Sequence, residues 1–494
     1  MNTVLFDLVI HNAKIVGSTS HAGDDQPQPR DVGIKDGKIA AIAPHIDASS
    51  AQEMLDAEGQ LLFPGVVDAH MHTGIYSILN EDAVTESRAA AMGGVTTSLN
   101  YMRTGQYYLN KSGSYRDFFP EVLQLSEGNF HVDYAYHLAP IMSSHIDEID
   151  YCADVLGVTS FKIFMFYGGH GLHGASNDQS KFLMTPAGDR YDIAHFEFIM
   201  RGVQRARERF PHLADSITLG LHCETAEIMR AYTNIVEREG KLEGLHAYSA
   251  ARPPHSEGLA IFIAAYLANE TALPNINLLH LTSRKAVDAA LQMQTVFPHI
   301  RFGREVTVGH LMLDVDSKAA AFAKVNPPIR PREDVEYLWE RVLDGSIDWV
   351  VSDHACCKTE YKLHCGEAGH SIFLAKSGFG GTEYLLPAMI TEGRRRGLSM
   401  SRIAALTSTN PAQRFGLPSK GRIEIGCDAD FAFVDPNATW TIHAEDSPSQ
   451  QGYTPFEGIE MTARVTRTLL RGKTVFADGN VVGAPQGKYL KRPY

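Results

Sequence analysis

Cysteine is scarce in this chain. Its 494 residues include six cysteines, and none of them has the paired spacing of a zinc finger or a redox motif. A disulfide-stabilised secreted domain is therefore excluded, and reduced thiols in a cytoplasmic protein are expected. The cluster Cys356, Cys357 and Cys365 matches no zinc pattern, so we interpret these residues as packing residues.

Basic charge and long apolar runs are also lacking. Lysine and arginine number 45 against 58 acidic residues, giving a formal net charge of -13, and no basic block could follow a phosphate backbone. Nucleic acid is excluded as a partner. The start, MNTVLFDLVIHNAKIV, has neither the basic beginning nor the apolar run of a signal peptide. We expect no membrane-spanning segment and a cytoplasmic location.

The two ends of the chain have the texture of short β-strands. Near the N-terminus these are DLVIHNAKIV, DVGIKDGKIAAI and EMLDAEGQLL, with a polar surface loop expected over residues 18–30. From Gly421 the same texture returns, with a DGN hairpin turn. We predict one small β-sandwich domain built from residues 1–60 and 416–494, with residues 61–415 forming a separate unit between them.

That central unit alternates short apolar runs with longer amphipathic segments, which indicates repeated β–α units and a parallel sheet. With 44% apolar residues the chain can bury a large core. A (β/α)8 TIM barrel is the predicted α/β fold, although a doubly wound open sheet would give the same local signals. The eight candidate strands are VVDAHMH, VTTSLNYM, FHVDYAYHLAP, VTSFKIFMF, ITLGLHCE, NINLLHLTS, IRFGREVTV and DWVVSDHA.

Potential metal ligands fall at the ends of these strands. His70 and His72 alternate in the first strand, so both side chains point to the same face. A lone histidine in an apolar strand is more often a core residue than a ligand. Six such groups at one end of a barrel are costly to bury unless something pairs them, and a metal cluster would do so. The further candidates are Lys162, His222, His280 and Asp353.

Lys162 has two interpretations. A protonated lysine repels a cation, and on residue chemistry alone a buried ion pair is the favoured role. A lysine whose pKa is lowered by burial can instead react with carbon dioxide, and the resulting anionic carbamate can bridge two metals.

The chain resembles the amidohydrolase superfamily, and within it the group of dihydropyrimidinases, hydantoinases, allantoinases and dihydroorotases. The resemblance covers nearly the whole length and follows the group's order of motifs. It is carried by FPGVVDAHMH, SFKIFMFY, ARPPHSEGLAI, NPPIR, VVSDHA, TSTNPAQRFGLPSKGRIEIGCDADFAFVDP and TPFEGIEMTARVTRTLLRGKTVFADGNVV.

The resemblance implies two divalent metal ions, zinc or alternatively manganese, iron or cobalt. One would be held by His70 and His72 and the other by His222 and His280, with N6-carboxylated Lys162 bridging both. Asp353 would ligate the first metal and shuttle protons, and Tyr167 would hydrogen-bond the developing oxyanion. The implied reaction opens a cyclic amide, a hydantoin-like or dihydropyrimidine-like ring, by attack of a metal-bridging hydroxide on the ring carbonyl.

Where the sequence departs from the group's usual motifs, the differences bear on which substrate is bound. His72 is followed by Thr73 and not by the arginine with which dihydroorotases hold a carboxylate, so dihydroorotate is not expected. Asn326 replaces the serine usual in hydantoinases, and we expect Asn326, Ser377 and Gly378 to bind the ring's imide edge. An allantoinase-like or other cyclic-imide hydrolase is the first alternative. A non-catalytic dihydropyrimidinase-related scaffold is the second.

Three further expectations concern the rim and the surface. Phe166 would narrow the pocket. The long segment from Gly168 to Arg190, with His170 and His173, would lie over the site and shape substrate entry. The group also implies a homo-oligomer, most often a tetramer, in which the tail QGKYLKRPY is either a contact or a loose terminus.

Overall fold

The computed structural model describes residues 5–17, 28–167, 191–363 and 371–494. Its centre is a sheet of eight strands in the order β13-β12-β11-β10-β9-β8-β7-β6, each parallel to its neighbours. All eight predicted barrel strands are confirmed. They are β6 (Val66–Met71), β7 (Val95–Met102), β8 (Asp133–Leu138), β9 (Ser160–Phe164), β10 (Thr218–His222), β11 (Asn275–Leu278), β12 (Arg301–Thr307) and β13 (Trp349–Val351).

The first and last strands meet, which closes the sheet into a barrel. Met71 pairs in parallel with His354, and the backbone N–H of His72 donates to the carbonyl of His354 at 2.7 Å. The alternative of a doubly wound open sheet is thereby excluded. Closure brings the carboxyl ends of all eight strands to one rim, which is where the active site of a TIM barrel lies.

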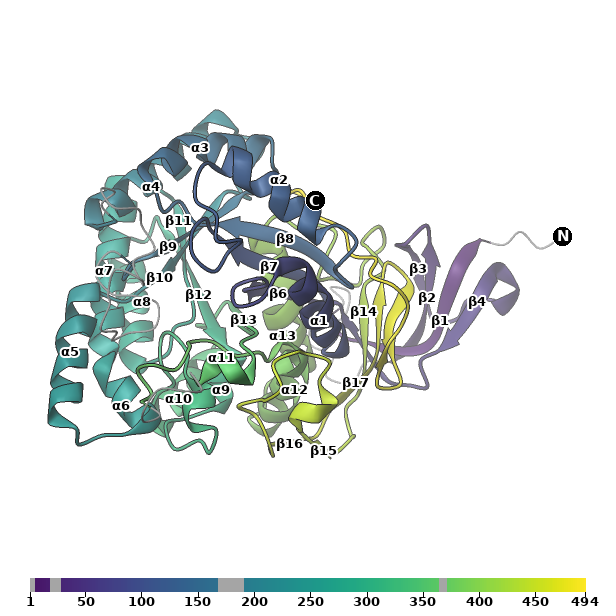
Figure 1. Ribbon diagram of the computed structural model, residues 1–494. Helices are drawn as coiled ribbons and strands as arrows, with labels where there is room; N and C mark the ends of the chain where they lie inside the picture. The colour runs from purple at the N-terminus through teal and green to yellow at the C-terminus, as the bar shows by residue number, and fades with distance from the viewer. Residues whose placement is uncertain (1–4, 18–27, 168–190, 364–370) are drawn as a thin grey trace.

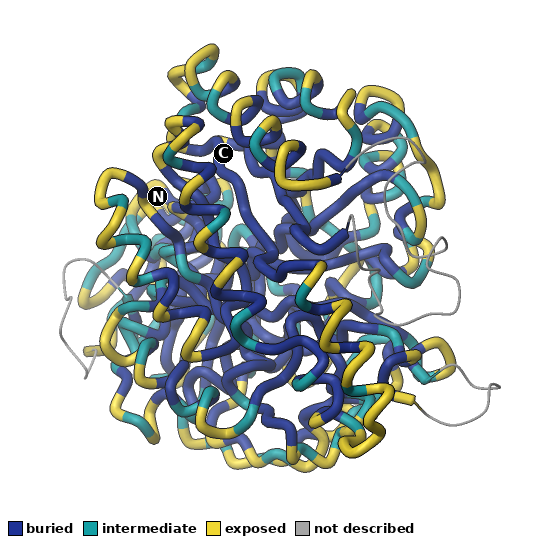
Figure 2. The backbone as a smooth tube through the Cα atoms, turned by 90° about the vertical axis from the view of Figure 1, so that its left-hand side faces the viewer, coloured by how far each residue is buried: buried dark blue, intermediate teal, exposed yellow. Residues whose placement is uncertain are grey.

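Helices cover the outside of the barrel, as Figure 1 shows for α3, α4, α5 and α7. Figure 2 shows buried chain in the interior and most of the exposed segments at the periphery. The α-helices are α1 (Leu79–Met92), α2 (Tyr115–Ser126), α3 (Ser143–Asp154), α4 (Ile193–Arg209), α5 (Ala226–Glu239), α6 (Gly244–Ala251), α7 (Pro254–Glu270), α8 (Arg284–Val296), α9 (Val308–Met312), α10 (Arg332–Leu343), α11 (Thr359–Lys362), α12 (Leu385–Arg395), α13 (Met400–Ala404) and α14 (Asn410–Arg414). Short 3-10 helices are η2 (Ala48–Ser50), η4 (Ala320–Ala323), η5 (Thr382–Tyr384) and η7 (Ala444–Asp446), and η6 (Ala405–Thr409) is a π-helix.

The two ends of the chain share a second sheet beside the barrel (Figure 1). Its path runs β19-β18-β17-β14-β5-β1-β2-β3, with β4 paired to β1, so the predicted union of the terminal segments is confirmed. The exact domain boundaries remain a proposal. Its strands are β1 (Phe6–Ile15), β2 (Pro29–Lys35), β3 (Lys38–Ala43), β4 (Ala51–Asp56), β5 (Leu61–Pro64), β14 (Phe431–Asp435), β17 (Arg464–Leu470), β18 (Lys473–Ala477) and β19 (Asn480–Val481); β15 (Trp440–Thr441) and β16 (Glu460–Met461) form a separate pair.

Pro29 and Arg30 lie in β2, so the expected surface loop does not reach residue 30, and its residues 18–27 lie outside the described part of the chain.

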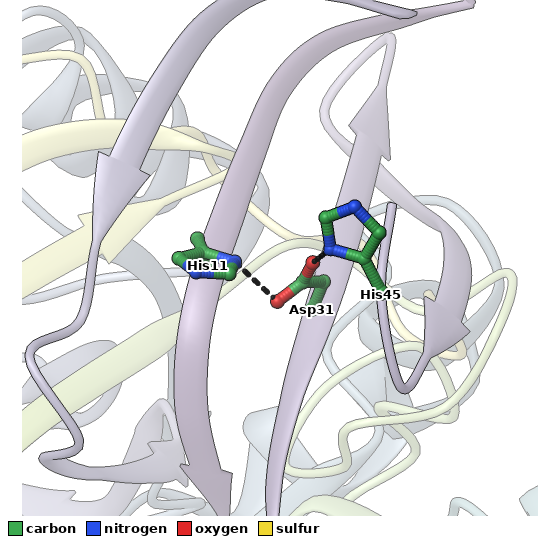
Figure 3. Close-up of side chains that lie close together, drawn as sticks. All are labelled: His11, Asp31 and His45. Carbon is green, nitrogen blue, oxygen red and sulfur yellow. Dashed lines mark hydrogen bonds and ion pairs between the residues drawn. The ribbon is translucent and has the colours of Figure 1, made fainter. Parts of the chain in front are cut away.

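A buried carboxylate, that of Asp31, joins β1, β2 and the segment after β3 (Figure 3). Asp31 contacts the Nδ1 atoms of His11 at 2.8 Å and His45 at 3.3 Å, and it accepts backbone N–H groups from Asn12 and Ile46 at 3.1 and 2.8 Å. Both its oxygens are therefore satisfied by protein groups, and we interpret the cluster as a structural clasp.

The C-terminal tail is not loose. Tyr489 forms a bridge with Tyr134 of β8, and Leu490 is fully buried. The buried guanidinium of Arg492 donates to the hydroxyl of Ser160 at 2.6 Å and to the carbonyl of Tyr136. The tail therefore packs against β8 and β9 of its own barrel.

Candidate metal centre

His70, His72 and Asp353 form the first half of the candidate site. His70 lies in β6 and His72 directly follows it, while Asp353 comes two residues after β13. Oδ1 of Asp353 lies 3.1 Å from Nε2 of His70 and 3.2 Å from Nε2 of His72. The three residues offer ligand atoms that all lie within 4.8 Å of one another, a spacing that suits a shared cation.

His222 and His280 form the second half. His222 ends β10, His280 follows β11 by two residues, and their ring centroids are 4.4 Å apart. Nδ1 of His280 is buried and has no hydrogen-bond partner among the described residues. Such an orphaned atom is costly unless a ligand satisfies it, and a metal ion would do so.

Lys162 of β9 lies close to the first half and shares the pocket with the second. Its Nζ is 3.1 Å from Nε2 of His70, and the ring centroids of His70 and His280 are 5.4 Å apart. Burial lowers the pKa of Lys162 to about 8, against the opposing charges of Asp353 and Glu305. A fraction of this amine is therefore neutral near pH 7 and competent to react with carbon dioxide.

The histidines are held neutral, as metal ligation requires. Burial lowers the pKa of His70 and of His280 well below 6.5 and that of His222 to about 4. Burial alone would raise the pKa of Asp353, but its close contacts with His70 and His72 and the charge of nearby Lys162 outweigh burial, lower that pKa and leave a carboxylate. The donor set is thus anionic and neutral together, which fits divalent cations.

The backbone is unusual at two of these residues. His280 has φ 37° and Asp353 has φ 55°, which place both in the left-handed region. Residues without the freedom of glycine adopt this conformation at a cost, and such strain gathers at functional sites. Here it turns each side chain inward just beyond the end of its strand.

Nine of the ten residues predicted from the sequence as metal ligands, catalytic residues or ring-binding residues line one pocket at this rim. His70 is the exception, since it lies just beneath and contacts Lys162 and Asp353. The nine are His72, Lys162, Tyr167, His222, His280, Asn326, Asp353, Ser377 and Gly378. Their roles remain predictions.

Aromatic side chains form much of the pocket wall. Phe164 and Tyr167 stack with centroids 4.3 Å apart, and Phe166 packs on His222 at 4.6 Å. Tyr76 and Tyr108 complete this lining. Phe166 therefore stands where the sequence predicted a narrowed pocket.

The polar edge around Asn326 is partly occupied by protein contacts. The hydroxyl of Tyr248 donates to Oδ1 of Asn326, and that of Tyr76 donates to the carbonyl of Ser377 at 2.7 Å. The N–H of Gly378 donates to the carbonyl of Lys324 at 2.9 Å, so it is not available as a donor to the ring.

Several supporting residues could not be singled out from the sequence. Oε1 of Glu305 lies 2.8 Å from Nδ1 of His70, and the hydroxyl of Tyr108 lies 2.8 Å from Nδ1 of His72. Oε2 of Glu224 lies 2.6 Å from Nε2 of His222 and is paired with Arg252. Such partners fix the orientation of metal ligands. The one indication of Glu305 in the sequence is that it is a charged residue inside the apolar strand IRFGREVTV.

Two predicted features lie wholly or partly outside the described residues. The segment from Gly168 to Arg190, with His170 and His173, is outside, as is Cys365. Cys356 and Cys357 are fully buried, which agrees with packing, and burial raises the pKa of both thiols. Reactive thiolates are not expected at these positions.

The fold and the pocket together define a barrel whose rim gathers candidate metal ligands. The chain belongs to the amidohydrolase family, whose model matches residues 222–475. It is 32% identical over 501 residues to an allantoinase of Rubrobacter xylanophilus, and 31% identical over 496 residues to an allantoinase of Escherichia coli; each alignment covers 98% of both chains.

Solved structures share the fold over the same length. The L-hydantoinase (dihydropyrimidinase) of Arthrobacter aurescens is 26% identical with a TM-score of 0.83, covering 98% of this chain and 99% of that one. The dihydropyrimidinase of Brevibacillus agri is 25% identical with a TM-score of 0.82 over 98% of both chains. The predicted resemblance to the cyclic amidohydrolase group is confirmed.

Proposed function

We propose that this protein is a binuclear metal-dependent hydrolase that opens a hydantoin-like or dihydropyrimidine-like cyclic amide. The observation that carries the proposal is the placement of Lys162 against His70 and in one pocket with His72, His222 and His280, four histidines whose pKa values are lowered by burial. A non-catalytic scaffold would have no need of such a set. All six ligand-type residues are present, which weighs against a relative that has lost catalysis.

The candidate ligands divide between two metal positions. His70, His72 and Asp353 would hold one cation and His222 and His280 the other, with carboxylated Lys162 between them. Zinc is the favoured metal, because imidazole and carboxylate donors suit it, and manganese, iron or cobalt are alternatives. Two such cations acidify water and polarise carbonyl groups.

The protein's own residues have distinct parts in the reaction. Asp353 accepts a proton from the attacking water and passes it to the departing ring nitrogen. The Tyr167 hydroxyl donates a hydrogen bond to the carbonyl oxygen as that oxygen becomes negative. Asn326, with Ser377 and Gly378, faces the rest of the ring. The single product carries a carboxylate at one end of the opened ring and a ureide or amide at the other.

The pocket wall bears on the choice of ring. Phe164, Phe166 and Tyr76 present apolar surface, which suits hydantoins with an apolar substituent or the CH2 groups of dihydrouracil. Allantoin is the second candidate, because curated relatives at 31–32% identity over the full length are named allantoinases. Its exocyclic group is polar, so a mainly aromatic wall favours it less.

We also propose a cytoplasmic homo-oligomer, with a tetramer favoured. None of the helices in the described part of the chain is long and apolar enough to cross a membrane. The outer face of α7 exposes Leu259, Phe262 and Tyr266, next to exposed Ile193 and Val296. An apolar face of this kind commonly marks a subunit contact. Sedimentation equilibrium measures the state directly.

The first test measures ring opening and metal content together. Purified, metal-analysed protein is assayed on hydantoin, 5-substituted hydantoins, dihydrouracil, allantoin and dihydroorotate. We expect about two metals per chain and opening of one ring class, with dihydroorotate inert. Lys162→Ala should lose bridging metal and lower kcat by at least a hundredfold, while Lys473→Ala, at an exposed lysine of β18, serves as the matched control.

Each outcome decides between the candidates. Preference for allantoin would make allantoin the substrate in place of a hydantoin-like or dihydropyrimidine-like ring. Two bound metals without any ring opening would place the substrate outside the panel and contradict the substrate proposal. Absence of both metal and activity from the wild-type protein would favour the scaffold and overturn the hydrolase.

A further inference from the structure

Arg103 is a buried cation immediately beyond the end of β7. It is 1% exposed, and its Nη1 donates to the carbonyls of Thr104 at 3.2 Å and Gln106 at 2.9 Å. These two bonds fix one corner of the guanidinium. They do not hold the other edge of the guanidinium, which carries Nε and Nη2.

That other edge lacks conventional partners. Nε and Nη2 of Arg103 are buried without a hydrogen bond in the described part of the chain, and no carboxylate there forms an ion pair with it. Other buried guanidinium groups near the pocket are paired, Arg252 with Glu224 and Arg330 with Glu257. Burying a cation that has no carboxylate partner among the described residues is costly, so a compensating role is expected.

Its neighbours are two tyrosines of the pocket wall. The guanidinium carbon lies 5.0 Å from the ring centroid of Tyr108 and 5.6 Å from that of Tyr167, both within cation–π range. Tyr108 is also the residue whose hydroxyl contacts His72. One cation therefore lies against both the proposed oxyanion donor and the partner of a proposed metal ligand.

We infer that Arg103 is a positioning residue that fixes the Tyr167 side chain and strengthens the hydrogen bond from its hydroxyl to the reacting carbonyl oxygen. The inference rests on the proposed function, in which Tyr167 is that donor. A fixed positive charge stabilises partial negative charge on the phenol oxygen, so the hydroxyl donates more strongly. In a buried pocket this effect is only weakly screened.

The electrostatics of Tyr167 point the same way. Burial raises its pKa above 10, while the charge of Arg103 and the approach of its N–H groups to the phenol oxygen oppose that rise. Without Arg103, burial would act alone. The Tyr167 ring also stacks on Phe164, with an interplanar angle of 4°. The side chain thus contacts both Arg103 and Phe164.

A double-mutant cycle tests whether Arg103 acts through Tyr167. The holoenzyme and the variants Arg103→Met, Tyr167→Phe and the double variant are compared on a ring that the wild type opens. Tyr167→Phe should lower kcat about a hundredfold or more, the usual effect of losing one oxyanion donor. Arg103→Met should lower kcat at least tenfold with KM changed less than threefold, and Arg103→Lys should recover part of the loss.

The cycle also gives the decisive comparison. In the Tyr167→Phe background, Arg103→Met should change kcat less than threefold. Equal losses in both backgrounds, or a loss confined to KM, would overturn the inference while leaving the hydrolase intact. No effect of Tyr167→Phe on a working enzyme would remove both the role of Tyr167 and the inference. Arg414→Met controls for removal of a buried guanidinium, since Arg414 bonds only Asn275 and Asn277 among the described residues.

A spectroscopic readout does not depend on turnover. In protein labelled with 13Cζ-tyrosine, the resonance lost in Tyr167→Phe identifies Tyr167. Arg103→Met should move that resonance, while Arg414→Met should not. An unmoved resonance would contradict the inference even if no ring in the panel were opened.

Discussion

Glu305 is the carboxylate that fixes the orientation of His70. It lies within β12, fully buried, and its second oxygen accepts the indole N–H of Trp349 at 2.8 Å. The backbone N–H of His280 donates to its first oxygen at 3.1 Å. One side chain therefore links candidate ligands of both metal positions. Burial raises the pKa of Glu305, while the hydrogen bond from Trp349 and the charge of Lys162 oppose that rise.

Replacing the Glu305 side chain should weaken metal binding or catalysis without abolishing either. We expect Glu305→Gln to lower metal affinity or kcat/KM by roughly 10–100-fold, the usual effect of losing an outer partner of a ligating histidine. Metal titration of the apoenzyme and steady-state kinetics measure the two quantities. Glu340→Gln, at an exposed position of α10, is the control. Unchanged metal affinity and unchanged kinetics would show that His70 does not depend on Glu305.

The candidate ligands could be found from the sequence because each lies at the end of a recognisable strand. Their supporting residues could not, since those contacts join distant parts of the chain. His70 and Glu305 are 235 positions apart, and their pairing depends on closure of the barrel. Arg103 carried no signal either, because an arginine after a strand is ordinarily exposed.

The edge formed by β1, β2 and the segment after β3 depends on Asp31. Burial raises the pKa of Asp31, but backbone hydrogen bonds from Ile46 and Asn12 and the charge of His11 outweigh it, leaving the pKa below 3.8. A carboxyl group with a depressed folded-state pKa stabilises the protein above its unfolded pKa. That stability is lost as the pH falls through the folded-state value.

We therefore expect Asp31→Asn to destabilise the protein by about 1–3 kcal/mol at pH 7, since hydrogen bonds to a charged acceptor are lost. The difference from wild type should be similar at pH 5 and should shrink below pH 4. Denaturation midpoints of the metal-free proteins measure it, with Asp147→Asn on the exposed face of α3 as control. A difference that grew on acidification would contradict this account of the clasp.

The barrel strands were predictable because each is a short apolar run between turns. Helices with strong amphipathic patterns, such as α4 and α10, were predictable too. The short pair β15 and β16 was not, because each strand has two residues and depends on tertiary packing. Local sequence carries little information about such elements.

At the scale of the whole molecule, Lys420 joins the barrel to the terminal sheet. Its buried ammonium contacts Asp133 of β8 at 2.7 Å, and Asp428 and Asp430 before β14 at 2.8 and 2.7 Å. These three carboxylates could suit a metal ion by geometry alone, but the lysine already supplies the cation. Burial lowers the pKa of Lys420, and the three carboxylates outweigh burial and raise it.

Removing that ammonium leaves buried carboxylates without their main cation. We expect Lys420→Met to destabilise the protein by about 3–5 kcal/mol. Thermal unfolding and the yield of folded protein measure this, and Lys473→Met on the surface of the same sheet is the control. An unchanged unfolding temperature would mean that Arg471, which also contacts Asp133, is sufficient on its own.

The docked tail has a consequence for how the chain is made. Tyr489 and Arg492 pack against β8 and β9, whose residues leave the ribosome more than 300 positions earlier. The sheet of the N-terminal strands is likewise incomplete until β14 and β17 have been synthesised. During synthesis there is therefore a long interval in which the barrel lacks its C-terminal tail and the second sheet is incomplete. Both then expose apolar surface. During that interval the nascent chain is a natural client for chaperones.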